Sequence, residues 1–228
     1  VISCGDLKEE STTTDTTAPV IAEVTAVTTP TNDSTPDYTF SSDEAGTITY
    51  GGSCSSSTSI VISGNNTITL NSLSDGTYSD CTIAIRSSTG YLSNILTITS
   101  FIVDSTAATL TEVTAVTTTN DNTPNYIFSS SEAGTITYGG SCSSSTTSVT
   151  TGSNTITLVS LSEGTYSDCT ITVTDTSSNS VTLNISSFVI DTTAPTIAEV
   201  TVVTTPNTGT TPNYTFSSDE AGTITYGG

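Results

Sequence analysis

The chain of 228 residues carries 22 acidic side chains against two basic ones, Lys8 and Arg86, for a net charge of −20 at pH 7. That balance excludes binding to nucleic acid or to an anionic membrane through a basic patch. Histidine, methionine and tryptophan are absent, and Thr, Ser, Val and Ile dominate. Because good helix formers are scarce and no apolar run could span a bilayer, the composition predicts an all-β protein without a transmembrane helix.

The N-terminal residues Val1-Ile2-Ser3-Cys4-Gly5 resemble the lipobox of bacterial lipoproteins, in which aliphatic and small residues precede a lipidated cysteine. A polar segment without apolar periodicity follows, as expected of a flexible spacer. The resemblance implies a lipid anchor at Cys4 and a tether over residues 1–14. It also explains why one of five cysteines has no partner. The alternative is a stray cysteine in a ragged N-terminus.

The rest of the chain is one unit written repeatedly. The stretch EAGTITYGG occurs at Glu44–Gly52, Glu132–Gly140 and Glu220–Gly228. A second marker, Asp-Thr-Thr-Ala-Pro or a close variant, begins at Asp15, Asp104 and Asp191. These markers predict module 1 over residues 15–103, module 2 over residues 104–190, and a truncated third copy over residues 191–228. The third copy contains the first three strands and stops before its cysteine pair, so we expect the parent protein to continue with more copies.

Module 1 has the strand pattern of a small β-sandwich. Alternating apolar and polar residues, separated by turn signals, predict seven strands. These lie near residues 20–27, 37–41, 47–50, 58–62, 67–70, 77–85 and 92–103. We place turns at residues 30–36, 45–46, 64–66 and 74–76, where Gly, Pro, Asn and Asp collect. Strands about every ten residues predict two facing sheets with a Greek-key order.

The other four cysteines form two equivalent pairs, Cys54 with Cys81 and Cys142 with Cys169. Equal spacing at matching places predicts one disulfide in each module and an oxidising compartment. A zinc site is disfavoured because there is neither a CxxC pair nor a histidine. In a Greek-key sandwich the third and sixth strands are neighbours, which brings Cys54 close to Cys81.

Tyr78 and Tyr166 follow equivalent Gly-Thr turns and are predicted to form tyrosine corners, in which the phenol hydroxyl donates to the backbone. We interpret both side chains as structural.

The tandem order of Asp-Thr-Thr-Ala-Pro, Asn-Asp-x-Thr-Pro-x-Tyr, Glu-Ala-Gly-Thr-Ile-Thr and Asp-Gly-Thr-Tyr resembles the bacterial immunoglobulin-like repeats of large cell-surface adhesins. The resemblance implies tandem immunoglobulin-like sandwiches in an extracytoplasmic, lipid-anchored protein of the bacterial surface or outer membrane. It implies a non-enzymatic spacer that carries a distal domain away from the envelope. The alternative is that the repeats are themselves adhesive and bind a glycan or a host or neighbour-cell protein. Tyr91 is the one aromatic candidate for such a face, and we expect monomeric repeats.

Catalysis is not expected. Without histidine, neither a Ser-His-Asp nor a Cys-His arrangement can be assembled. The adjacent carboxylates Asp43 and Glu44 become Ser131 and Glu132 in module 2, so the pair is not repeated. The glycine pairs lack the lysine and the following helix of a phosphate loop.

A calcium site at each joint between modules is the one cofactor hypothesis. The first expected strand begins at the same end of the sandwich as the loop between the second and third strands and the loop between the sixth and seventh strands. Acids from these three segments should therefore converge. The predicted sets are Asp15, Asp43 and Glu44; Asp104, Glu132 and Asp175; and Asp191, Asp219 and Glu220. Carboxylate oxygens from separate loops can hold Ca²⁺. The alternative is that Asp104 and Asp191 only form Asx-type turns and that the glutamate is a solvated loop acid. We expect no other cofactor.

Overall fold

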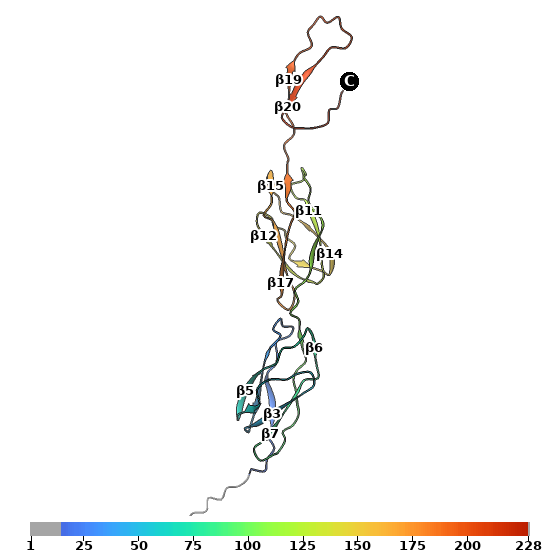
Figure 1. The fold of residues 1–228 in the computed structure, drawn as a ribbon. Helices are drawn as coiled ribbons and strands as arrows, with labels where there is room; N and C mark the ends of the chain where they lie inside the picture. The colour runs from blue at the N-terminus through green and yellow to red at the C-terminus, as the bar shows by residue number, and fades with distance from the viewer. Residues whose placement is uncertain (1–14, 228) are drawn as a thin grey trace, which may run out of the picture.

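The structure is a computed structural model that describes residues 15–227, so Cys4 and the tether lie outside the described residues. All regular secondary structure in this range is β, in twenty strands. Within the same range, no helix has the length and apolarity that crossing a membrane requires. Figure 1 shows the modules following one another end to end, with the third copy beyond module 2.

Module 1 is a sandwich of two antiparallel sheets. The first sheet has the order β1 (Ile21–Thr25), β2 (Asp37–Ser42) and β5 (Gly64–Thr69). The second has the order β4 (Ile60–Val61), β3 (Gly46–Gly51), β7 (Thr82–Ser87) and β8 (Leu96–Thr97). A two-stranded sheet joins β6 (Gly76–Tyr78) to β9 (Phe101–Val103). The all-β tandem sandwich predicted from the sequence is confirmed.

Module 2 repeats this topology. Its first sheet has the order β10 (Leu110–Thr114), β11 (Asn125–Ser130) and β14 (Gly152–Thr157). Its second has the order β13 (Ser148–Val149), β12 (Gly134–Gly139), β16 (Thr170–Thr174) and β17 (Ser180–Asn184). The small sheet pairs β15 (Gly164–Tyr166) with β18 (Phe188–Ile190).

Each module closes its own hydrophobic core. In β2 the side chains alternate, so that Tyr38 and Phe40 are fully buried while Asp37 faces solvent. One cluster of buried side chains uses residues from Ile21 to Val103, and a second uses residues from Val116 to Ile190. The period of two therefore sets which face of each strand enters the core.

Two expected strands prove to be wrong in their extent. The strand expected over residues 77–85 is divided into β6 and β7, and the one expected over residues 92–103 into β8 and β9. The reason is that β6 and β9 pair with each other, whereas β7 and β8 pair within the four-stranded sheet. The chain changes sheets just before Cys81, whose bond to Cys54 fixes the second segment against β3.

The turn expected at residues 64–66 is also wrong, because these residues form the start of β5. Gly64 lies opposite Ser42, and Asn66 lies opposite Phe40. The Asn66 side chain accepts from the Ile62 amide (2.9 Å) and donates to the Ile62 carbonyl (2.8 Å). The Asn66 side chain thus bonds to the backbone groups of Ile62, which leaves the backbone of residues 64–66 free to pair with β2.

Both expected disulfides are present. Cys54 is bonded to Cys81 and Cys142 to Cys169, each with Cα atoms 5.2 Å apart. Each bridge links the loop after the third strand of the repeat to the start of β7 or β16. By the chain-entropy argument, closing a loop of this size contributes on the order of 3 kcal/mol to stability.

Residues 192–227 contain two strands, β19 (Ile197–Thr201) and β20 (Thr215–Ser218), paired as β1 pairs with β2. Tyr214 is 54% exposed there, whereas its counterparts Tyr38 and Tyr126 are fully buried. Tyr214 and Ile197 line an open groove of about 460 Å³. Within the described residues, the side chains that form a core in modules 1 and 2 are uncovered in this copy.

The tyrosine corners are confirmed, and they differ from a second pair of tyrosines. Tyr78 donates to the Ser74 carbonyl and Tyr166 to the Ser162 carbonyl, both at 2.8 Å. In contrast, the buried hydroxyls of Tyr38 and Tyr126 lie near the Glu23 and Glu112 carboxylates but make no hydrogen bond of normal geometry with other described residues. Burial, together with the nearby Glu23 and Glu112 carboxylates, raises the pKa of Tyr38 and of Tyr126.

This difference predicts unequal responses to the same change. Tyr78→Phe should cost about 1 kcal/mol of unfolding free energy, because a made hydrogen bond is lost. Tyr38→Phe should cost less, because the Tyr38 hydroxyl lies near the Glu23 carboxylate without a hydrogen bond of normal geometry. Urea denaturation of the two variants beside the parent chain measures both values. Equal destabilisation by the two substitutions would contradict the distinction.

Candidate functional site

The polar chemistry of the molecule collects at the joint between modules 1 and 2. The connecting residues, 104–109, run from the end of β9 at Val103 to the start of β10 at Leu110. So short a connection leaves few backbone torsions free between the two sandwiches. Its geometry therefore depends on how the connecting residues are hydrogen-bonded on either side.

On the side of module 1, Asp75 holds the connection. Its carboxylate accepts from the amide (2.8 Å) and hydroxyl (2.7 Å) of Ser105 and from the hydroxyl of Thr106 (2.5 Å). These bonds, led by the one from Thr106, lower the pKa of Asp75. The Asp104 amide also donates to the Thr31 carbonyl at 2.9 Å. Three consecutive connecting residues are thus fixed to module 1.

On the side of module 2, the loop between β16 and β17 reaches the same residues. Asn179 donates to the Asp104 carbonyl (2.8 Å), and the Ser177 hydroxyl donates to the Asp104 carboxylate (3.0 Å). Asn32 of module 1 donates directly to the Ser178 carbonyl at 3.4 Å. Asp104 is therefore bonded to both modules.

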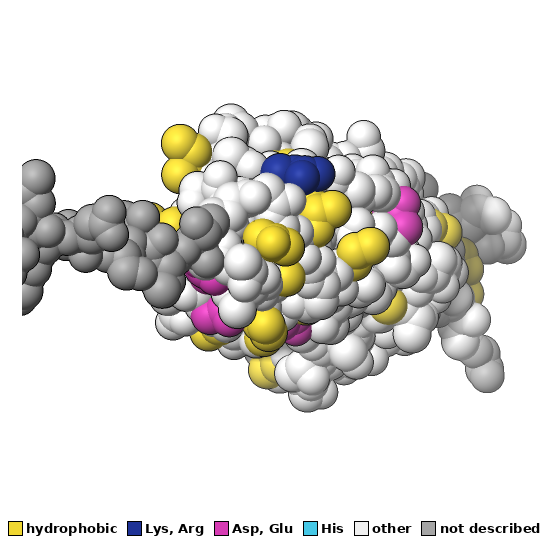
Figure 2. Space-filling model, turned by 90° about the horizontal axis from the view of Figure 1, so that it is seen from below, with side chains coloured by type: hydrophobic (Ala, Val, Ile, Leu, Met, Phe, Trp, Pro, Cys, Tyr) yellow, Lys and Arg dark blue, Asp and Glu magenta, His cyan; other side chains and the backbone are white. Residues whose placement is uncertain are grey.

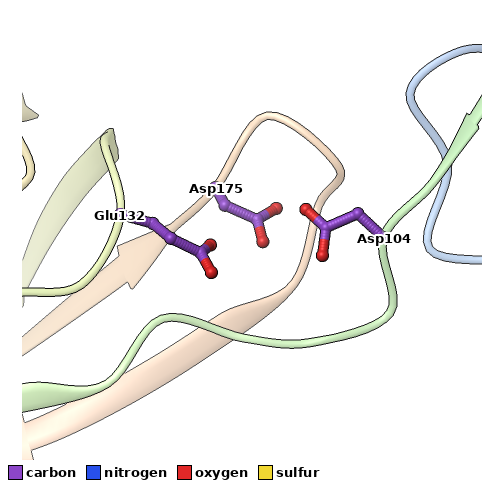
Figure 3. A group of neighbouring side chains, drawn as sticks. All are labelled: Asp104, Glu132 and Asp175. Atoms are coloured by element: carbon purple, nitrogen blue, oxygen red, sulfur yellow. The ribbon is translucent and has the colours of Figure 1, made fainter. Parts of the chain in front are cut away.

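Three carboxylates meet at this joint. Asp104 follows β9, Glu132 lies between β11 and β12, and Asp175 follows β16. Each offers an oxygen atom within 4.8 Å of the oxygens of the other two. Figure 3 shows the three side chains converging from separate segments. The sequence predicted this set, and the spacing is one that a single Ca²⁺ could bridge with oxygen ligands.

The protein's own hydrogen bonds also account for the position of Asp175. One of its oxygens accepts from the amides of Ser177 (2.8 Å) and Asn179 (2.9 Å), and the other accepts from the Asn179 side chain (2.9 Å). This is an Asx-type turn. Asp175 is therefore fixed in place whether or not a cation binds. The alternative left by the sequence concerned Asp104 and Asp191, whose carboxylates accept from the amides of Thr106 and Thr193 at 3.3 Å. Calcium binding stays a prediction.

The charges of the cluster oppose one another. Partial burial, followed by the negative charges of Asp104 and Asp175, raises the pKa of Glu132. A raised carboxyl pKa means that the folded state resists ionisation. The contribution of Glu132 to stability is thus greatest below its unfolded pKa and is lost as the pH rises through its folded pKa.

The other two predicted sets are not assembled in the same way. Among the described residues, only the set between modules 1 and 2, which is Asp104, Glu132 and Asp175, has three carboxylates close enough to bind one metal ion. In module 1, Ser87 stands where module 2 has Asp175, and the Thr17 hydroxyl bonds to both Asp15 (2.6 Å) and Glu44 (3.0 Å). Asp43 instead accepts from the Val20 amide (2.7 Å).

In the third copy, Asp219 accepts from the Thr196 amide (2.6 Å), as Asp43 does from Val20. The pKa of Glu220 is raised, first by burial and then by the negative charges of Asp191 and Asp219. The three acids thus influence one another electrostatically without converging as those between modules 1 and 2 do.

Sequence reasoning missed the most connected acid of the joint, Asp75. From sequence alone, the Ser-Asp-Gly stretch that contains Asp75 indicates only a turn. Glu163 occupies the equivalent place in module 2 and bonds to the hydroxyls of Thr192 and Thr193. An acid that recurs immediately before the Gly-Thr-Tyr of each module was the signal that could have revealed this role.

No protein-family model matches the chain, and no curated protein matches it. Among the solved structures that are distantly similar is SGBP-B of the Bacteroides ovatus mixed-linkage glucan utilization locus, in complex with a mixed-linkage heptasaccharide. The two share 16% identity with a TM-score of 0.24, over 79% of this chain and 47% of that one. This chain thus spans less than half the length of that structure, and so weak a likeness supports no argument about function.

Relief of charge repulsion at the joint is testable with Glu132→Gln. Without divalent cations at neutral pH, the variant should raise the melting temperature of module 2 by roughly 1–4 °C, the scale of a surface charge pair. The advantage should shrink as the pH falls and Glu132 of the parent chain becomes protonated. Scanning calorimetry across pH 3.5–7.5 measures this, and Glu44→Gln in module 1, where Asp175 has no counterpart, is the control.

The same samples decide the calcium hypothesis. If the cluster binds Ca²⁺, millimolar calcium should raise the melting temperature of the parent chain and have a smaller effect on Glu132→Gln. If the parent chain has the same melting temperature in calcium and in chelator, the hypothesis that the joint binds calcium is contradicted.

Proposed function

We propose that the chain is a non-enzymatic spacer in an extracytoplasmic protein, built to hold a distal part of that protein away from its point of attachment. The observation that carries the proposal is the joint at residues 104–109, where Asp75 and Asn179 bond the connecting residues to both modules. A flexible linker would need no such bonds. A stack of sandwiches joined this way transmits position along its length.

Two further features, the disulfides and the negative charge, support this function. The two disulfides suit an oxidising compartment outside the cytoplasm. They also keep part of each module closed if the array is pulled. The high negative charge keeps neighbouring copies soluble and apart. In this proposal, the lipobox-like residues at Cys4 anchor the protein to a bacterial envelope, and the modules are repeats of the adhesin type.

An adhesive role for the modules themselves is the second candidate. Glycan-binding faces characteristically present aromatic rings that stack on sugars. Tyr91, which is 41% exposed, is the aromatic residue on which such a face would depend, and Asn179 takes its place in module 2. A single ring that is not repeated favours the spacer.

The spacer proposal predicts that the joint bonds maintain the extended shape. Asp75→Ala combined with Asn179→Ala should leave both modules folded but allow them to bend. Small-angle X-ray scattering should then show a shorter mean maximum dimension and a broader distribution of shapes. Asp43→Ala, which changes an acid at the opposite end of module 1, is the control and should leave the scattering unchanged.

If the double variant keeps the scattering profile of the parent chain, the joint bonds do not set the shape. If the parent chain already scatters as freely jointed modules, the spacer proposal itself is contradicted.

A further inference from the structure

The outer surface of the four-stranded sheet of module 1 carries an unusual set of side chains. We name it the Arg86 face, and it consists of Ile60, Ile62, Arg86, Leu92 and Ile95. Its four aliphatic members are 72%, 64%, 53% and 74% exposed, in that order. Scattered single exposed residues need no explanation, but a contiguous apolar patch on a monomer marks an interaction surface.

The strand register brings three members of the face, Ile60, Arg86 and Leu92, into one row across the sheet. Thr47 of β3 lies opposite Ile60 on one side and Arg86 on the other, and Arg86 is bridged to Leu92. These residues therefore form one row across the outer face of the sheet. Leu96 pairs with Ile83 and packs inward, so Ile95 beside it points outward. An open groove of about 280 Å³ runs between Ile60 and Arg86.

Figure 2 views module 1 from its N-terminal end and shows one dark blue side chain bordered by hydrophobic ones. Arg86 is that side chain, since the other basic residue, Lys8, lies outside the described part of the chain. Its guanidinium donates to the Gly90 carbonyl at 2.8 Å. Within residues 15–227 no carboxylate lies within ion-pair distance of it. The guanidinium retains donors for an external acceptor.

Module 2 shows that the fold does not require this surface. Ser148 pairs with Thr135 as Ile60 pairs with Thr47, and Thr174 replaces Arg86 on the next strand. The Thr150 amide bonds to Asn154 as that of Ile62 bonds to Asn66. Thr182, next to Leu183, takes the place of Ile95. The same sandwich therefore closes with a polar face at every equivalent position.

The chemistry of the face defines its partner. An arginine that shares a sheet face with exposed aliphatic side chains, as Arg86 does with Leu92 and Ile60, is typical of a protein–protein interface. Its charge calls for a carboxylate, which Arg binds in bidentate fashion. The aliphatic neighbours call for apolar side chains beside that carboxylate. An acidic sugar would satisfy the arginine alone, because the patch offers isoleucines and a leucine where a sugar-binding face offers aromatic rings.

We propose that the Arg86 face of module 1 docks a segment of another protein in which a carboxylate is flanked by aliphatic side chains. This function goes beyond that of a spacer and does not depend on it. Module 2, whose equivalent face is polar, does not take part. The array thus has one binding module, with its neighbour as a built-in negative control.

Isoleucine-methyl NMR of the full chain tests the proposal with a defined probe, the blocked peptide Ser-Ile-Val-Asp-Val-Ile-Ser. The peptide should shift the methyl signals of Ile60, Ile62 and Ile95 and leave those of Ile136 and Ile171 in module 2 unchanged. Replacing the peptide aspartate with asparagine, or Arg86 with threonine, should each weaken binding about tenfold, because a charge-assisted pair is lost.

The matched variant is Ile60→Ser, Ile62→Thr, Arg86→Thr, Leu92→Ser and Ile95→Thr, which gives module 1 the residues that module 2 carries at these positions. Ser180 is the counterpart of Leu92, because it pairs with Thr174 as Leu92 pairs with Arg86. The matched variant should abolish the shifts. The proposal is overturned if the peptide causes no shifts, or if the matched variant binds equally well. It is also overturned if a glucuronate-containing disaccharide binds more tightly than the peptide.

The Arg86 face could instead be covered by a second copy of the chain or by the chain's own N-terminal segment. Each alternative predicts a distinct NMR result that would overturn the proposal. Concentration-dependent shifts of the same methyl groups without peptide would show that a second copy of the chain occupies the face. Shifts on deleting residues 1–14 would show that the chain's own N-terminal segment covers it.

Discussion

Burial of alternating side chains inside a single repeat is the constraint on which the structure depends. In β2 and β7, every second residue enters the core, and the two sheets meet over Tyr38, Phe40 and Ile85. The side chains of each core are buried within their own module, and hydrogen bonds such as those of Asn32 and Asn179 cross the joint. An array of such units can lengthen without changing the unit, which is the physical basis of a stalk. Residues 192–227 show the converse, since two strands alone leave Tyr214 and Ile197 exposed.

Polar contacts then decide what the array can do. Asp75 and Asn179 bond to the same short connection from opposite sides, and three carboxylates converge beside it. Because all of these groups except the buried Asp175 are exposed or half-buried, pH and cations act on the joint before they act on either core. Stiffness and stability are therefore carried by different parts of the molecule. A spacer gains from this separation, because the joint can be tuned without disturbing the fold.

The sequence predicted those features that depend on local pattern and on duplication. Repeated cysteines predicted both disulfides, and the Gly-Thr-Tyr motif predicted the bonds of Tyr78 and Tyr166. Features that depend on strand register were out of reach. The division of β6 from β7 follows from which partner each segment finds, and Asn66 replaces an expected turn with side-chain bonds. The Arg86 face also needs the register, because its members are distant in sequence and meet only across the sheet.

Independence of the modules is the central claim, and hydrogen exchange after disrupting one core tests it directly. Ile85 is fully buried in module 1, and Ile85→Asp would place a charge in that core at a cost of several kcal/mol. The account predicts that the amides of β1 to β9 lose protection while those of β11, β12 and β16 keep it. Loss of protection in both modules together would mean that the chain folds as one unit, and would contradict the account.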